Sequence, residues 1–175
     1  MSNNTYVEVG EKVSLRLSTT EDIPMVVAWR NKERVRMNHV YRRDFTVEGQ
    51  KAWMEKNVDT GKAVQFILCE NSGRPIGVVH FHSIDKENGS AEYGIYIGED
   101  DAIGKGYGSE AAVLALSYAR DVLHLKKAVL QAFAYNTSAI KSYTRAGFVQ
   151  TGVLNDVECS DGQKNDMIIM EKSLQ

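Results

Sequence analysis

The sequence predicts a mixed α/β fold: a largely antiparallel, twisted sheet of about seven strands with helices on both faces. Two observations carry this prediction. Strand-like runs alternate with helical ones along the whole chain, and a glycine-rich turn opens a long helical run between two strand-like runs near its middle. A strand, a helix and a second strand in this order form a parallel, right-handed crossover. The remaining strands follow one another closely, which favours antiparallel pairing.

The first half of the chain is expected to hold one strand, two helices and three further strands. Residues 13–17 alternate apolar and polar side chains, as in a half-buried strand. Thr19 or Thr20 can cap a first helix and Thr46 a second, because a threonine oxygen accepts a hydrogen bond from free N–H groups. The segment 31–44 between these helices is polar and strongly basic, and predicts a connection. The three strands are expected at residues 63–69, 76–81 and 91–97.

The second half is expected to complete the crossover and add a hairpin. A helix is predicted at residues 109–122, followed by an apolar strand at 128–133 that reads as buried on both faces. A short helix at 137–146 ends before Gly147, the residue type that most often follows a helix. The last two strands are expected at residues 148–154 and 166–170, on either side of a turn at Gly162.

The composition indicates one enzyme-sized domain spanning residues 1–175, with a core at about 13–172. The net charge of −2, with both signs interspersed, argues against a nucleic-acid partner. No apolar run approaches the ~20 residues needed to cross a bilayer, so no membrane partner is expected. Cys69 and Cys159 form no C-x-x-C pair, which favours a reduced, cytoplasmic setting.

The segment with the most chemical meaning is 103–109, Ile-Gly-Lys-Gly-Tyr-Gly-Ser. Glycines at alternate positions open a helix whose first N–H groups stay unpaired, and such a helix start binds phosphate or pyrophosphate. Neither common phosphate motif fits: Gly106 stands where a Walker A loop needs Ser or Thr, and Ser109 where the dinucleotide fingerprint needs Gly. A glycine-rich turn without a ligand is the alternative interpretation.

Three motifs in this order make the chain resemble the GNAT superfamily of acyl-CoA-dependent N-acyltransferases. Strand 92–97 leads into the glycine loop at 104–111, the segment 136–140 is similar to the family's Asn-x-x-Ser-Ile helix start, and 143–148 carries its Tyr followed by Gly-Phe. The resemblance covers residues 13–172. One departure is Ile103, because the family's loop usually opens there with Arg or Gln.

The resemblance implies direct transfer of an acetyl group from acetyl-CoA to a primary amine, without a metal. An alkylamine with a pKa near 10.4 arrives protonated and needs a base. Glu92 is the first candidate and Glu99 the second, although Glu92 could merely pair with a nearby cation. By resemblance, Tyr143 is the general acid and the Ile97 N–H is the oxyanion donor; core packing is the alternative role of Tyr143. The co-substrate is expected to bind Ile95, Tyr96, Ile97, Gly104, Lys105, Gly106, Tyr107, Gly108, Ser109, Asn136, Ser138 and Tyr143.

The amine acceptor stays open between an amino sugar, a polyamine or similar small molecule, and a protein N-terminus. Trp-Arg-Asn at 29–31, followed by Val-Arg-Met at 35–37, resembles the branch that acetylates amino sugars on nucleotide carriers. The overall pattern resembles the branch acting on ribosomal-protein N-termini. A basic cluster near this segment is either a solvated face or a site for an anionic substrate. Its members are Arg30, Lys32, Arg34, Arg36, Arg42 and Arg43.

Other interpretations are weighed beside the enzyme. A non-catalytic acyl-CoA sensor or interaction module would use the same glycine loop. His80 and His82 share one face of a predicted strand, but no third ligand has matching spacing, so no metal site is expected. Cys69 lacks a partner histidine and is expected to pack in the core. Dimers are common in the family, which implies a homodimer.

Overall fold

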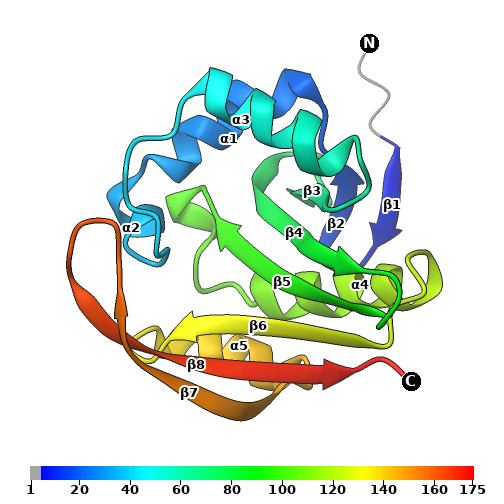
Figure 1. The fold of residues 1–175 in the computed structure, drawn as a ribbon. Helices are drawn as coiled ribbons and strands as arrows, with labels where there is room; N and C mark the ends of the chain where they lie inside the picture. The colour runs from blue at the N-terminus through cyan, green and yellow to red at the C-terminus, as the bar shows by residue number, and fades with distance from the viewer. Residues whose placement is uncertain (1–4) are drawn as a thin grey trace.

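A computed structural model, which describes residues 5–175, contains one sheet of eight strands in the order β1-β2-β3-β4-β5-β6-β8-β7 (Figure 1). All neighbouring strands are antiparallel except β5 and β6, which are parallel. The predicted mixed α/β class with a central crossover is therefore confirmed. The strands are β1 (Tyr6–Val9), β2 (Val13–Leu17), β3 (Val64–Glu70), β4 (Pro75–Asp85), β5 (Ser90–Ile97), β6 (Lys127–Phe133), β7 (Val149–Glu158) and β8 (Lys164–Ser173).

Helices cover both faces of this sheet, and α4 makes the crossover from β5 to β6 (Figure 1). The Thr46 hydroxyl caps α3 by accepting the Gly49 N–H at 3.0 Å, as predicted. None of the helices within residues 5–175 is long and apolar enough to cross a membrane. The helical elements are η1 (Thr20–Asp22), α1 (Ile23–Arg30), α2 (Glu33–Arg36), α3 (Val47–Trp53), η2 (Met54–Val58), η3 (Asp100–Ala102), α4 (Tyr107–Asp121) and α5 (Thr137–Arg145).

Strand alternation divides the core into two layers. Phe66 and Val79 point to the α4 side, where they share a buried cluster with Ala112. Their chain neighbours Ile67 and Val78 point to the opposite side and pack with α1. This period of two follows from the pleat of a strand. The same alternation determines which side chains of β4 and β5 face the α4 side of the sheet and which face the α1 side.

Three features differ from the sequence-based prediction. Strand β1 makes the eighth strand, and α2 lies inside the segment expected to be only a connection. Both have four residues, too few for a recognisable periodicity. The expectation that residues 128–133 are buried on both faces is wrong, because Gln131 is exposed. One face of β6 is open at Gln131, which lines a cleft.

Candidate active site

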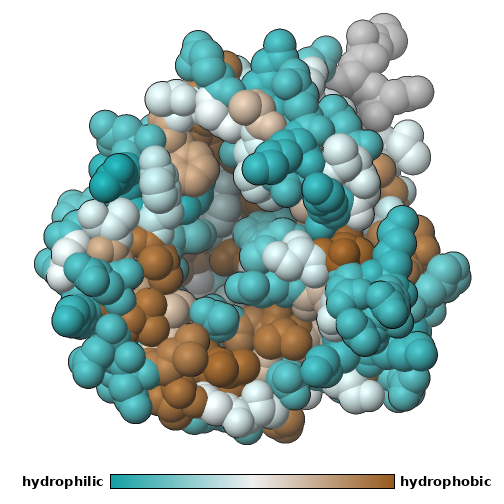
Figure 2. All heavy atoms as spheres, viewed as in Figure 1, coloured by the Kyte–Doolittle hydropathy of each residue, from teal (hydrophilic) through white to brown (hydrophobic). Residues whose placement is uncertain are grey.

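The central feature of the site is the gap between β5 and β6. Their parallel pairing covers only Ser90–Glu92 against 127–129, after which the strands diverge (Figure 1). The gap continues into a cleft of about 630 Å³ between the glycine loop and α5. In the space-filling view of Figure 2, the face of the molecule is hollowed in this region, with hydrophobic residues along its lower wall. The residues expected to bind the co-substrate all line this cleft except Lys105, and so do the two residues first expected to react, Glu92 and Tyr143.

The glycine loop supplies one wall of the cleft. Gly106 directly precedes α4, and its backbone is left-handed, with φ of 78°. Glycine adopts this conformation without strain because it has no Cβ. No side chain caps this helix. The N–H groups of Tyr107, Gly108 and Ser109 belong to the first turn, so they have no acceptor within the helix. Together with the helix dipole, they form a site for an anion.

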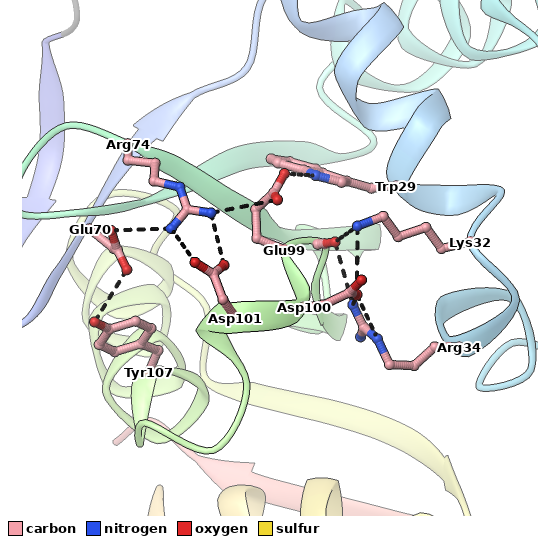
Figure 3. A network of polar contacts seen from close by, with 10 residues as sticks. Trp29, Lys32, Arg34, Glu70, Arg74, Glu99, Asp100, Asp101 and Tyr107 are labelled. Atoms are coloured by element: carbon pink, nitrogen blue, oxygen red, sulfur yellow. Dashed lines mark hydrogen bonds and ion pairs between the residues drawn. The ribbon is translucent and has the colours of Figure 1, made fainter.

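The turn before the loop is fixed by an ionic network (Figure 3). Arg74, which directly precedes β4, binds the Asp101 carboxylate through two bonds of 3.0 and 2.8 Å. Arg34 from α2 binds the Asp100 carboxylate at 2.7 Å. These two arginines hold η3 from opposite sides. The network thereby positions the glycine loop against the sheet.

The edge of β5 offers free backbone groups to the gap. The Gly98 N–H donates to the Ile76 carbonyl at 2.7 Å, so residues 98 and 76 form a hydrogen-bonded pair of the antiparallel ladder. Because such pairs alternate, the Ile95 and Ile97 backbone groups point away from β4 and toward the gap. The Ile97 carbonyl accepts a bond from Arg34 Nη1 at 2.9 Å. The Ile97 N–H therefore faces the space where β5 and β6 diverge.

Tyr143 approaches the cleft from α5. Its ring packs edge-on against Tyr93 and Phe148, with centroids 6.1 and 6.0 Å away. Burial raises the pKa of the Tyr143 hydroxyl to about 12. The phenol is therefore protonated at neutral pH and can donate a proton. Tyr143 lines the cleft, where a ligand can accept that proton.

The helix that carries Tyr143 is itself capped at the cleft. Asn136 precedes α5, and its side-chain carbonyl accepts the Ala139 N–H at 3.4 Å and the Ser138 hydroxyl at 3.5 Å. Ser109 meets Ser142 across α4 and α5, with their hydroxyl oxygens 3.1 Å apart. Asn136 and Ser109 therefore also have structural roles, as a helix cap and as a contact between helices.

The two carboxylates considered as bases differ sharply in the structure. Glu92 lines the cleft, and its Oε1 lies 3.7 Å from His82 Nε2 on the neighbouring strand. Glu99 instead accepts a 2.7 Å bond from Trp29 Nε1 and lies 3.6 Å from Arg74 Nη2 (Figure 3). Glu99 lines neither of the two cavities at the site. The geometry therefore favours Glu92.

A second cavity, of about 660 Å³, lies on the α1–α3 side of the sheet. It shares His39, His80, His82 and Tyr96 with the cleft, so the two spaces meet at these side chains. Desolvation lowers the pKa of His80 to about 3, and this imidazole is neutral at physiological pH. The His80 ring lies across Gly94 on the adjacent strand, where any added Cβ would come within 2.4 Å of its Nε2.

The predicted basic cluster does not form one anion site. Arg36 binds Asp44 at 2.6 Å, and the buried Arg42 binds Asp161 at 3.1 Å. Arg34 and Lys32 contact Asp100. Arg43 is exposed to solvent. Arg30 differs from all of these, because it is buried and lines the second cavity.

Several residues at the two cavities escape the sequence analysis. His39, Gln131 and Met167 lie on segments without a functional motif. Arg30 does carry a signal: it continues the apolar i, i+3, i+4, i+7 stripe that begins at Ile23 in α1. A cation at such a core position calls for an explanation. The His80 and His82 ring centroids lie 5.3 Å apart, with the ring planes tilted by 33°. Residues 5–175 hold no group of three metal-ligating side chains.

Comparisons with known proteins agree with this geometry. The family profile described as the acetyltransferase (GNAT) domain matches residues 12–149. An uncharacterized N-acetyltransferase of Bacillus licheniformis, p20, is 29% identical over 163 residues, covering 90% of each chain. A prophage-derived uncharacterized N-acetyltransferase of Bacillus subtilis, YokL, is 23% identical over 159 residues, covering 91% of this chain and 88% of that protein.

Solved structures with the same fold include spermidine N-acetyltransferase from Vibrio cholerae in complex with CoA and spermine. It superposes with a TM-score of 0.85 at 22% identity, covering 93% of this chain and 95% of that one. A dodecameric structure of spermidine N-acetyltransferase from the same organism gives a TM-score of 0.79, also at 22% identity, with 93% and 94% coverage. Neither comparison singles out the amino-sugar or the ribosomal-protein branch. With the glycine loop, the parted strands and the family profile in agreement, the chain belongs to the GNAT family of N-acetyltransferases.

Proposed function

We propose that this protein transfers the acetyl group of acetyl-CoA directly to a primary amine of a small molecule or a protein N-terminus. The observation that carries the proposal is the divergence of β5 and β6 beyond Glu92, with free backbone groups on one side and the α4 N-terminus at its mouth. The pyrophosphate would bind the N–H groups of the first turn of α4. The pantetheine arm would extend along the edge of β5.

In the proposed reaction, Glu92 first accepts a proton from the ammonium group, and the neutral amine nitrogen then attacks the thioester carbonyl carbon. The carbonyl oxygen becomes an oxyanion, for which the Ile97 N–H is the proposed donor. The C–S bond then breaks, and Tyr143 gives its proton to the departing thiolate. The attacking nitrogen loses its second proton, which returns through solvent to the Tyr143 phenolate, and Glu92 releases its proton to solvent. The products are an N-acetyl amide and free CoA thiol.

The two proton-transfer groups approach the gap from opposite faces of the sheet. Tyr143 packs with Tyr93, which belongs to the core cluster on the α4 side. Glu92 is one residue away from Tyr93 on β5, so strand alternation directs its side chain to the α1–α3 side. An amine entering from the second cavity would therefore meet the base before it meets the thioester. This order suits a direct transfer.

The experiment that tests the proposal measures thiol release from acetyl-CoA against a panel of primary amines. The panel holds amino-sugar nucleotides, polyamines, aminoglycosides, amino acids and short peptides. Turnover with one class is the expected result. Tight acetyl-CoA binding without turnover on any class would favour the non-catalytic sensor, and absence of CoA binding would overturn the assignment of the glycine loop. The homodimer implied by the family stays a prediction that light scattering can test.

A further inference from the structure

The second cavity contains a buried cation without a counter-ion. Arg30 is 7% exposed, and its Nη1 is fully buried without a hydrogen-bond partner. Within residues 5–175, no carboxylate makes an ion pair with this guanidinium. Its Cζ lies 4.2 Å from the centre of the Phe45 ring, so one face is covered by an aromatic side chain. Desolvation lowers the Arg30 pKa to about 10, which still leaves the group charged at neutral pH.

An unpartnered buried guanidinium is costly, because its charge has lost water without gaining an ion pair. Proteins keep such groups where a ligand completes them, and the fork of an arginine matches carboxylate and phosphate oxygens. Arg30 lines a cavity of about 660 Å³ that meets the cleft, so a ligand can reach it. The Arg30 guanidinium is thus suited to bind an oxyanion that enters the second cavity.

The other charges around the second cavity have the same sign. Lys62 lies exposed at its rim, and the described part of the cavity lining contains no Asp or Glu. His39 and His80 are neutral at physiological pH, because desolvation lowers their pKa values to about 4 and 3. The remaining polar groups include the Gln50 and Gln65 amides. A polyamine would have to place its second ammonium group beside Arg30 with no carboxylate to balance it.

We propose that the amine acceptor carries a carboxylate or phosphate group, which binds the Arg30 guanidinium while the amine reaches Glu92. This inference rests on the proposed acetyl transfer and names the chemical class of its acceptor. It separates this chain from the spermidine acetyltransferases that share its fold, whose named substrate is a polycation. The shared residues His80 and His82 mark the passage between the anion subsite and the reacting centre.

The test compares matched amines that differ in one anionic group. O-phosphoethanolamine is paired with ethanolamine, and β-alanine with propylamine, with putrescine as the polyamine. We expect the anionic member of at least one pair to have a kcat/KM about 10- to 100-fold higher, the range for a charge-assisted hydrogen bond. A preference confined to one pair identifies phosphate or carboxylate as the anion. Putrescine turned over as well as the anionic amines would overturn the inference.

Substitution of the arginine assigns the preference to its side chain. Arg30→Gln should abolish the anion preference, Arg30→Lys should restore part of it, and the exposed control Arg43→Gln should leave it unchanged. CoA affinity and the melting temperature show whether each variant is folded. An anion preference that persists in a folded Arg30→Gln protein would refute the subsite.

The inference can fail separately from the proposed function. If no amine is acetylated, the acetyl-transfer proposal fails, and calorimetric binding of O-phosphoethanolamine against ethanolamine still tests the subsite. Tighter binding of the phosphate that is lost in Arg30→Gln supports the anion site. Equal affinity of the two amines for the wild-type protein contradicts it.

Discussion

The two cavities that meet at His80 and His82 differ in the chemical groups that they offer to a ligand. The cleft between β5, β6 and α4 offers backbone groups for binding, which are the uncapped N–H groups of α4 and the unpaired edge of β5. The second cavity presents side chains, among them a buried arginine, two glutamines and neutral histidines. Backbone groups can hold a co-substrate with little dependence on neighbouring side chains. A side-chain surface changes with each substitution, so the acceptor side is where specificity can vary.

The largest effect should come from Glu92, which lines the cleft beside the shared residue His82. Glu92→Gln keeps the shape of the side chain but removes the proposed proton acceptor, so kcat should fall by about 10²- to 10⁴-fold at neutral pH. The deficit should shrink as the pH rises toward the amine pKa of about 10.4, because the free amine then needs no base. Steady-state rates between pH 7 and 10 check this. A deficit of constant size at every pH would remove Glu92 from the role of base.

On the cleft side, Tyr143→Phe removes one hydroxyl from a ring that packs on two others. We expect kcat to fall by about 10²-fold, since the thiolate must leave without a proton, while CoA affinity changes little. Calorimetry with CoA and single-turnover rates separate the two quantities. Equal losses in CoA affinity and in turnover would instead indicate that Tyr143 only shapes the cleft.

The contrast between backbone groups in the cleft and side chains in the second cavity also explains which site residues could be predicted from the sequence. Backbone sites need glycines where the chain turns or where a partner comes close, and glycine spacing is visible at residues 104–108. The motif residues also lie within one stretch of the chain, on β5, in the glycine loop, at the start of α4 and along α5. The motif residues that line the cleft could therefore be named from the sequence, with the exception of Lys105, which does not line it. His39, Gln131 and Met167 also line the cleft and could not be named in this way.

The second cavity could not be predicted in the same way. Its residues come from α1, α3, β3 and β4, and only the three-dimensional packing brings Gln50, Gln65 and His82 together. The basic cluster was visible, but charge alone does not say which cation is paired. The structure separates Arg36, which has Asp44, from Arg30, which has no carboxylate among the described residues. Whether an arginine forms an ion pair depends on the fold and cannot be inferred from the composition.

A smaller effect is expected at the start of α4. Gly106→Ala places a Cβ on a residue with φ of 78°, and the nearest atom to that Cβ would be Lys12 Nζ at 3.7 Å. The cost therefore comes from the left-handed backbone, about 1–2 kcal/mol, and not from crowding within the protein. Relaxation of this strain should move the N–H groups of the first turn and weaken CoA binding about 10-fold.

Gly162→Ala is the matched control, because Gly162 also has a left-handed φ, of 84°, with no atom within 4 Å of an added Cβ. It lies in the turn between β7 and β8, outside both cavities. Denaturant unfolding and CoA calorimetry are measured on both variants. Similar stability losses with a loss of CoA affinity only in Gly106→Ala would assign the anion site to α4. Loss of CoA affinity in both variants would show that the affinity falls because the protein is generally destabilised.

The smallest effect concerns the pH dependence of the acceptor side. Desolvation, reinforced by Arg30, lowers the pKa of His39 from 6.5 to about 4, so the folded protein keeps this imidazole neutral. The unfolded chain binds a proton first as the pH falls below 6.5. The contribution of His39 to the free energy of unfolding is therefore fully present above pH 6.5 and declines toward pH 4, by at most about 1.4 kcal/mol per pH unit.

His39→Asn should flatten this decline in urea unfolding measured from pH 7 to pH 4. The control His124→Asn, at an exposed histidine beyond α4, should not. Parallel curves for all three proteins would show that protonation of His39 is not coupled to folding.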